Sequence, residues 1–396
     1  MGVLEGIRVI EIAEALAGPY AAMLMGDLGA DVIKIERPGV GDQARQWGAR
    51  LPGEESAYFA ATNRNKRSLT LNIQKEEGRA LLQSLLVSAD VVILNIPREE
   101  SLQRAALNWE ALHTRHPRLI VASVTGYGRT GPYAGRSGYD LVAQGEAGLM
   151  ALTGTPETVP MRYPVPLADM TAGLYTVIGV LAALRARDAS GQGQHVDTSL
   201  LESQAAYLTI LAGDYFATGR APQPLGNAHP GIAPYQVFKT ADRDVIIAVG
   251  SDKLWAQFCE VVPLGPEVRD DPRFATNPAR LAHRAELATL IETRLATQTA
   301  DDLLARLREA EIPCGPINSP ADVLAHEQYL ARGNVVSMQH PSAGEIRSLA
   351  SPVRLSESVS EYRLPPPRVG EHTGEVLRDL GVAPQTMLEL RHRGVV

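Results

Sequence analysis

The chain has 396 residues, of which 45% are hydrophobic and 21% charged, a composition typical of a soluble globular protein with a large core. This composition argues against a disordered, collagen-like or repeat protein. The net charge of −7 argues against a general nucleic-acid or membrane-surface binder, so we expect neither partner. Two isolated cysteines, Cys259 and Cys314, fit neither a disulfide framework nor a CxxC metal site, and with no signal-peptide pattern they favour the cytoplasm.

The first 200 residues alternate strand-like and helix-like segments. Residues 8–12 and 31–35 are β-branched runs, and between them Pro19 opens and Gly29 ends a helical pattern. Further strand candidates lie at 90–94, 119–124 and 194–198, and helical patterns lie at 76–88, 107–115 and 170–187. This alternation predicts a parallel sheet with helices on both faces, an α/β fold.

The pattern changes after about residue 200. Ser199 and Glu202 predict a capping box at the start of a helix, and a stretch rich in Gly and Pro follows. A hairpin is expected at 235–239 and 245–249, followed by helices at 252–262, 283–297 and 301–310. We therefore predict a large α/β domain over 1–200, a linker over 201–224, a small α+β domain over 225–325 and a return segment over 326–396 that packs on the large domain.

The turn after the first predicted strand contains one glycine, Gly18. A dinucleotide-binding fold needs a glycine-rich turn at this place, so that the backbone can approach a pyrophosphate. No GxxxxGK[ST] motif occurs either. We expect no nicotinamide or ATP chemistry, no permanently bound cofactor and no metal site.

Asp169 stands directly before a predicted helix whose apolar residues, among them Leu174 and Ile178, have helical spacing. One interpretation is an N-cap, in which the carboxylate accepts the first free N–H groups. In the other, the same N–H groups and the helix dipole keep the carboxylate ionised, so that it can act as a nucleophile. Gly173 and Gly179 would permit close approach of a ligand or a second helix.

Basic residues offer a site for a phosphorylated ligand. The densest run in the first 200 residues contains Arg64, Lys66 and Arg67, and its alternative interpretation is a solvated surface cluster. Arg37 follows the second predicted strand, at the strand end where α/β folds bind ligands.

At these residues the chain resembles the class III coenzyme A transferases, the family of formyl-CoA and carnitinyl-CoA transferases. The motifs that carry the resemblance occur in order along nearly the whole chain, at 16–19, 29–38, 63–68, 126–132, 167–169, 191–194, 271–274 and 367–373. The resemblance implies a Rossmann-like large domain without the nucleotide fingerprint. It also implies a homodimer of interlocked open rings, each chain threaded by the other.

The resemblance further implies that Asp169 attacks an acyl-CoA thioester, which gives an acyl-aspartyl anhydride and CoA thiolate, and then an aspartyl-CoA thioester. The acceptor carboxylate attacks that thioester, and CoA finally passes to the acceptor's acyl group. The substrates would be acyl-CoA esters and small carboxylic acids. No Ser-His-Asp set is needed, because the reaction requires no proton transfer.

Other residues take roles by the same resemblance. The basic residues match positions around the phosphates and adenine of CoA: Arg37, Arg64, Lys66, Arg67 and, as weaker matches, Arg98 and Arg104. Backbone amides of Leu16 and Ala17 match an active-site loop that can stabilise an oxyanion. The remaining candidates for the substrate site are Tyr58, Tyr139, Asp140 and His229.

The substrate acid is suggested by residues 41–48, 138–140 and 233–240, which look most like the transferases that use succinyl-CoA and a dicarboxylic acid. Hydroxymethylglutarate, glutarate, malate and itaconate are acceptors in that group. A dicarboxylate leaves one carboxylate free after acylation, and Arg45 is the candidate partner for it, the alternative being a surface arginine.

A second activity in the same family is α-methylacyl-CoA racemisation, which abstracts a proton beside the thioester with a histidine and an aspartate. The racemases have Gly-His-Asp where this chain has Gly138-Tyr139-Asp140. Tyrosine, with a pKa of about 10, is a poor base at pH 7, so the racemase is the less favoured alternative.

Overall fold

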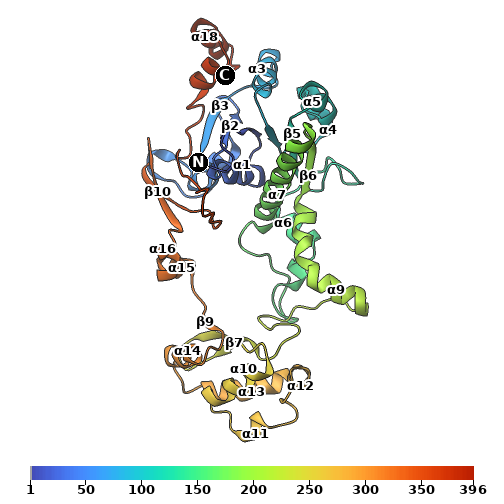
Figure 1. The fold of residues 1–396 in the computed structure, drawn as a ribbon, viewed down its shortest axis with the longest axis vertical. Coiled ribbons are helices and arrows are strands. Elements are labelled where there is room, and N and C mark those ends of the chain that lie inside the picture. Colours follow the sequence, from blue (N-terminus) through green and yellow to red (C-terminus); the bar gives the residue numbers. More distant parts are fainter. Residues whose placement is uncertain (1) are drawn as a thin grey trace. The chain divides into compact units, whose positions relative to one another are not determined.

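The computed structural model describes residues 2–396 and divides into two compact units. The first unit comprises Met1–Met150, Arg162–Arg220 and Leu330–Val396, and the second comprises Ala151–Met161 and Ala221–Tyr329. The short segment 151–161 therefore groups with the second unit, although it lies inside the predicted large domain. Figure 1 follows the chain through the elements of both units.

The first unit is built on a six-stranded parallel sheet, which confirms the predicted α/β class. The strand order is β3-β2-β1-β4-β5-β6, and Ile10 of the central β1 pairs with both Ile33 and Val92. The strands are β1 Arg8–Ile12, β2 Asp31–Glu36, β3 Lys66–Thr70, β4 Val91–Leu94, β5 Ile120–Thr125 and β6 His195–Ser199. Five of them lie where β-branched runs predict strands, and β3 was missed because it begins with two cationic residues.

Helices cover both faces of this sheet. The α-helices of the first unit are α1 Ala17–Asp27, α2 Ala57–Thr62, α3 Glu76–Leu86, α4 Glu99–Ala105, α5 Trp109–Arg115, α6 Asp140–Glu146, α7 Leu167–Ser190, α8 Leu200–Ala205, α9 Thr209–Thr218, α17 Thr373–Asp379 and α18 Pro384–His392. One face packs on residues of α3, α4, α5, α17 and α18, and the opposite face packs on α1 and α7. The return segment also forms a hairpin of β10 Val335–His340 and β11 Gly344–Leu349.

The second unit is a small α+β unit. Its antiparallel sheet has the order β7-β8-β9, from β7 Tyr235–Lys239, β8 Asp244–Ala248 and β9 Cys314–Pro316. Its helices are α10 Asp252–Val261, α11 Pro266–Arg269, α12 Asn277–Ala282, α13 Arg284–Leu295, α14 Ala300–Glu309 and α15 Pro320–Ala325, with α16 Glu327–Ala331 at its boundary. Phe238, Phe258 and Phe274 are fully buried in its core.

Helix α7 corrects an expectation about which of its faces is buried. Of the apolar residues that defined its helical spacing, Leu174 is exposed to 44%, Ile178 to 60% and Leu181 to 37%, and only Leu184 is buried. The buried face is made of smaller residues because α1 packs closely on it: a Cβ added to Gly173 would lie 2.9 Å from the carbonyl oxygen of Ala17. Gly179 has a similar role against β6, where an added Cβ would lie 2.5 Å from Val196.

By length and composition alone, α7 is also apolar enough to cross a membrane. Half of its most apolar window is buried inside the structure, and the core helix of a soluble protein passes the same test. The close packing of α7 on α1 and β6 therefore explains its small apolar residues without a bilayer.

Candidate active site

A cavity of about 930 Å³ opens at the carboxyl ends of the six parallel strands, and all its lining residues belong to the first unit. Parallel α/β sheets bind ligands at this end because the strand-to-helix loops converge there. The cavity brings together six of the residues expected from the sequence: Leu16, Ala17, Arg37, Tyr58, Tyr139 and Asp169.

Asp169 lies in the first turn of α7, and Pro166, not Asp169, occupies the N-cap position. Asp140 performs the capping instead, since its Oδ1 accepts a hydrogen bond of 2.8 Å from the backbone N–H of Ala168. Within residues 2–396, the Asp169 carboxylate has neither a hydrogen-bond partner nor an ion-pair partner. The N-cap interpretation of Asp169 is therefore wrong, because a carboxylate distant in sequence takes the free amide.

The electrostatics of Asp169 also differ from expectation. Burial, and to a smaller extent the negative charge of Asp140, together raise the pKa of its carboxyl to about 7. The expected stabilisation of the anion by the helix amides and dipole does not dominate. The carboxyl is thus poised between its two protonation states near neutral pH, which is typical of functional carboxylates.

Two tyrosines line the same cavity as this carboxylate. Burial and the charges of Asp169, Asp140 and Asp42 raise the pKa of Tyr58 to about 12, so that its phenol stays a neutral donor. Tyr139 is 63% exposed and therefore is not part of the core. Trp47 packs edge-on against Tyr58 with ring centroids 5.4 Å apart and completes this wall of the cavity.

The loop between β1 and α1 forms the wall beside α7. Ala15 has a φ of +70°, in the left-handed region that residues other than glycine rarely adopt. Leu16 is the N-cap residue of α1 and Ala17 is its first residue. The N–H groups at this end of a helix have no intrahelical acceptor. No partner for either N–H group exists in the part of the chain that the structure describes. The cavity therefore contains free amides in the wall that contacts Gly173, one turn beyond Asp169.

Arg37 is the one basic side chain among the described residues that line the cavity. Its side chain is 57% exposed, and its Nε lies 3.1 Å from Oε1 of Glu14. Because this pair is open to solvent, its net stabilisation is small, and an incoming phosphate can replace the carboxylate. Burial raises the pKa of Glu14, which weakens its hold on Arg37 further.

The basic run at 63–68 is neither a phosphate site on this cavity nor a solvated surface. Arg64 is buried in an ion pair with Asp27 at 2.6 Å, and Lys66 is buried in one with Glu11 at 2.8 Å. Arg67 is 13% exposed and binds Asp31 at 2.7 Å. Internal carboxylates neutralise these charges, so the structure gives no support to their expected contact with CoA.

Arg45 corrects the expectation for the second carboxylate of the substrate. Its guanidinium forms two hydrogen bonds to Glu36, of 2.8 and 2.7 Å, and lies over the ring of Phe59. With 7% exposure it is absent from the cavity lining, and Glu36 already occupies its Nε and Nη2 groups.

The remaining expected residues lie away from the cavity lining. Arg98, directly before α4, and Arg104, in its last turn, are both exposed. Arg98 lines a separate cavity of about 750 Å³. His229 belongs to the second unit, where its ring stacks on Tyr235 and its Nδ1 accepts from the N–H of Gly231. Their roles stay predictions.

Sequence reasoning missed several lining residues, among them Glu14, Asn72, Gln74 and Asn95. Glu14 and Asn95 follow β1 and β4, so their places after predicted strands were a usable signal. Asn72 and Gln74 follow β3 and could be found only once that strand was known.

Comparison with known proteins agrees with this site. The model of CoA-transferase family III matches residues 4–373. A succinate–glutarate CoA-transferase of Agrobacterium fabrum is 42% identical over 97% of both chains, and a human succinyl-CoA:glutarate CoA-transferase is 37% identical over 99% of this chain and 90% of its own. The crystal structure of a CaiB/BaiF family protein from Brucella suis, 42% identical, superimposes with a TM-score of 0.84 over 96% of this chain and 99% of that one. The chain therefore belongs to CoA-transferase family III.

Proposed function

We propose that this CoA-transferase moves CoA from succinyl-CoA to a short dicarboxylic acid, with Asp169 as the covalent nucleophile. The observation that carries the proposal is an unpartnered carboxylate in the wall of a 930 Å³ cavity, a size suited to a ligand as large as a CoA ester. The names of the relatives support the class of acid, since they include transferases for glutarate, D-citramalate and L-malate.

In the proposed reaction, an Asp169 carboxylate oxygen bonds to the thioester carbon, and the C–S bond breaks to release CoA thiolate. The thiolate then attacks the aspartyl carbonyl of the anhydride, which releases the donor acid and leaves an aspartyl-CoA thioester. The acceptor carboxylate repeats the sequence in reverse. Free amides of Leu16 and Ala17 stabilise the oxyanion of each tetrahedral intermediate.

Arg37 is the proposed partner for a CoA phosphate, because it is the cationic side chain on the cavity lining that the structure describes. This contact is distant from the thioester, and such binding energy can offset the strain of forming an anhydride. Arg45 is bound to Glu36 and Arg37 is assigned to the phosphate, so the described lining residues offer the second carboxylate no further guanidinium. The neutral hydroxyl groups of Tyr58 and Tyr139 are its proposed donors.

We propose a cytoplasmic homodimer of interlocked chains for the assembly. Large apolar side chains of α7 and α9 stand exposed, including Ile178 at 60%, Ile210 at 72% and Phe216 at 82%. Exposed apolar surface of this kind marks a protein interface. The second copy would bury these side chains.

The test is to incubate the enzyme with succinyl-CoA and a panel of acids, with glutarate first and malate, itaconate and hydroxymethylglutarate beside it, and to separate the CoA esters formed. We expect succinate release matched by one new dicarboxyl-CoA. Formate, oxalate and carnitine serve as controls. Exchange of solvent deuterium into the α-carbon of a 2-methylacyl-CoA, without transfer to any acid, would favour the racemase instead.

A further inference from the structure

Beneath the β1–α1 loop, charged side chains are buried in a cluster that the proposed reaction does not use. Each is at most 7% exposed, and three acids balance three bases. The members of this loop-support cluster are Glu11, Lys34, Glu36, Asp42, Arg45 and Lys66. Because an unpaired buried charge costs several kcal/mol, such a cluster persists only with close pairing.

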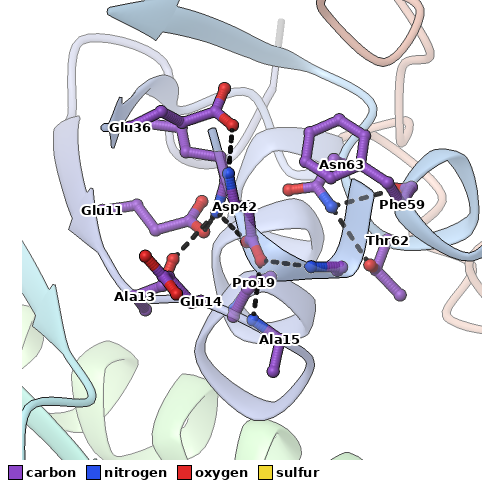
Figure 2. Close-up of polar contacts among 12 residues, drawn as sticks. Glu11, Ala13, Glu14, Ala15, Pro19, Glu36, Asp42, Phe59, Thr62 and Asn63 are labelled. Atoms are coloured by element: carbon purple, nitrogen blue, oxygen red, sulfur yellow. Dashed lines mark hydrogen bonds and ion pairs between the residues drawn. The ribbon is translucent and has the colours of Figure 1, made fainter. Parts of the chain in front are cut away.

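Lys34 makes three close polar contacts inside this cluster, two hydrogen bonds and one ion pair. Its Nζ lies 2.6 Å from Oε1 of Glu11, 2.8 Å from Oδ2 of Asp42 and 2.8 Å from the carbonyl oxygen of Ala13. The third contact is the important one, since Ala13 is the first residue of the loop after β1 (Figure 2). Burial alone would lower the pKa of Lys34, but the Glu11 and Asp42 carboxylates outweigh it and raise the pKa, so the ammonium stays charged.

Lys66 has the same arrangement one strand further out. Its Nζ lies 2.8 Å from Oε2 of Glu11, 2.7 Å from Oδ1 of Asn63 and 2.8 Å from the carbonyl oxygen of Pro19. Pro19 is in the first turn of α1. Glu11 therefore contacts two ammonium groups, each of which also holds one end of the same loop.

Asp42 holds the middle of the loop. Its Oδ1 accepts hydrogen bonds of 3.1 Å from the N–H of Ala15 and 2.9 Å from that of Ala44. From the other side, Asn95 accepts from the N–H of Glu14 at 3.2 Å and donates to its carbonyl oxygen at 2.7 Å. The left-handed conformation of Ala15 is unfavourable, and such conformations persist where surrounding contacts over-determine them.

We propose that Lys34 and Asp42 are positioning residues for acyl transfer, which hold the free amides of Leu16 and Ala17 in place beside Asp169. This inference rests on the proposed role of Asp169 as nucleophile. A donor contributes to an oxyanion hole only if it is already fixed where the charge develops. A displacement of about 1 Å in such a group can lower the rate about 100-fold.

Two double variants test the proposal while keeping the cluster neutral, because Glu11 still pairs with Lys66 in both. Lys34→Met/Asp42→Asn removes the tether on Ala13 but keeps an oxygen to accept from Ala15, and we expect kcat to fall about 10-fold. Lys34→Met/Asp42→Leu removes both tethers, and we expect a fall of about 100-fold. In both variants KM for succinyl-CoA should stay within about threefold, since the amides act mainly in the transition state.

The matched control is Arg187→Met/Asp90→Asn, which removes a partly buried ion pair of 3.0 Å near the far end of α7. This pair lies about 27 Å along the helix from Asp169, given 1.5 Å per residue, and does not touch the loop. Thermal unfolding of all variants gives the folded fraction, and rates are expressed per folded molecule. If the leucine variant does not fold, the asparagine variant still decides, by its difference from the control.

The second readout is the rate at which succinyl-CoA labels Asp169, trapped with hydroxylamine and measured by mass spectrometry. We expect the labelling rate to fall in the same order as kcat. Labelling of Asp169 at the wild-type rate in both variants, or a kcat equal to that of the control, would overturn the positioning role and leave the proposed function intact. An absence of label in the wild-type enzyme would instead overturn the proposed function, and this inference with it.

Discussion

Beneath the β1–α1 loop, Glu11 and Asp42 are each held by a lysine ammonium within 2.8 Å, whereas Asp169 at the start of α7 is influenced chiefly by burial and by the like charge of Asp140. Burial alone would raise the pKa of Asp42, but Lys34 and two backbone amides lower it, while the pKa of Asp169 rises to about 7. Asp42 and Asp169 nevertheless lie at the same edge of one sheet, where its parallel strands end.

This contrast distinguishes carboxylates with a structural role from the carboxylate that reacts. A carboxylate whose oxygens are all paired contributes to a rigid framework. Its partners stabilise the anion and occupy the oxygens that would attack a substrate. A carboxylate that is buried without a partner is costly, and its elevated basicity favours attack on a carbonyl. The strongest test of this contrast is to remove the unpaired group.

Asp169→Asn should lower turnover at least about 1,000-fold, because the amide cannot form the anhydride. The same variant should be more stable than wild type. The folded carboxyl keeps its proton up to pH about 7 while the unfolded one loses it near 3.8, so folding stability falls as pH rises between these values. We expect a gain of up to about 4 kcal/mol at pH 8 and none at pH 3, measured by denaturant unfolding; equal stability at both pH values would contradict the raised pKa.

Arg64→Met tests the paired class of charge. It leaves Asp27 buried without its cation, and breaking a buried ion pair costs about 3–5 kcal/mol. Urea unfolding should show this loss, while the folded enzyme keeps its KM for succinyl-CoA within about twofold. A large rise in KM with little loss of stability would restore the sequence-based assignment of Arg64 to CoA.

Arg37→Ala should behave in the opposite way. Its ion pair with Glu14 is exposed, so the loss of stability should be under about 1 kcal/mol. Loss of a phosphate contact should raise KM for CoA esters about 10-fold, with KM for the free acid nearly unchanged. Equal effects on both substrates would refute the phosphate role, and Arg98→Ala is the comparison for an exposed arginine outside this cavity.

Asp140→Asn should give the smallest effect, a displacement of the pH profile. The amide oxygen can still accept from Ala168, so the start of α7 is kept, but the charge that raises the pKa of Asp169 is removed. In wild type, kcat/KM should rise with pH through about 7, as Asp169 ionises. In the variant this rise should move to lower pH; an unmoved profile would show that Asp140 does not influence the nucleophile.

Much of the fold was predictable because it depends on local pattern. Strands β1, β2, β4 and β5 are rich in β-branched residues, β6 was also predicted, and their alternation with helices is enough to predict a parallel sheet. Strand β3 was hidden by Lys66 and Arg67, which resemble a surface cluster unless one knows that Glu11 and Asp31 lie beside them. Those partners come from other strands, and pairing across a sheet leaves no trace in local periodicity.

The candidate site likewise has features that local sequence predicts and features that depend on residues distant in the chain. Asp169 could be singled out from its own neighbourhood, but its cap and its charge environment depend on Asp140, which a different segment brings into place. Arg45 was a reasonable partner for a carboxylate, and the structure supplies that carboxylate internally as Glu36. Residue type indicates which interaction a side chain can make, and the fold decides whether a protein group or a ligand makes it.

The central claim is that Asp169 becomes covalently bonded to its cargo during turnover. Wild-type enzyme incubated with succinyl-CoA, quenched with hydroxylamine and digested, should give a hydroxamate on the peptide that contains Asp169, and Asp169→Asn should give none. A hydroxamate at another carboxylate such as Glu14, or full transfer activity with no modified peptide at any time point, would contradict it.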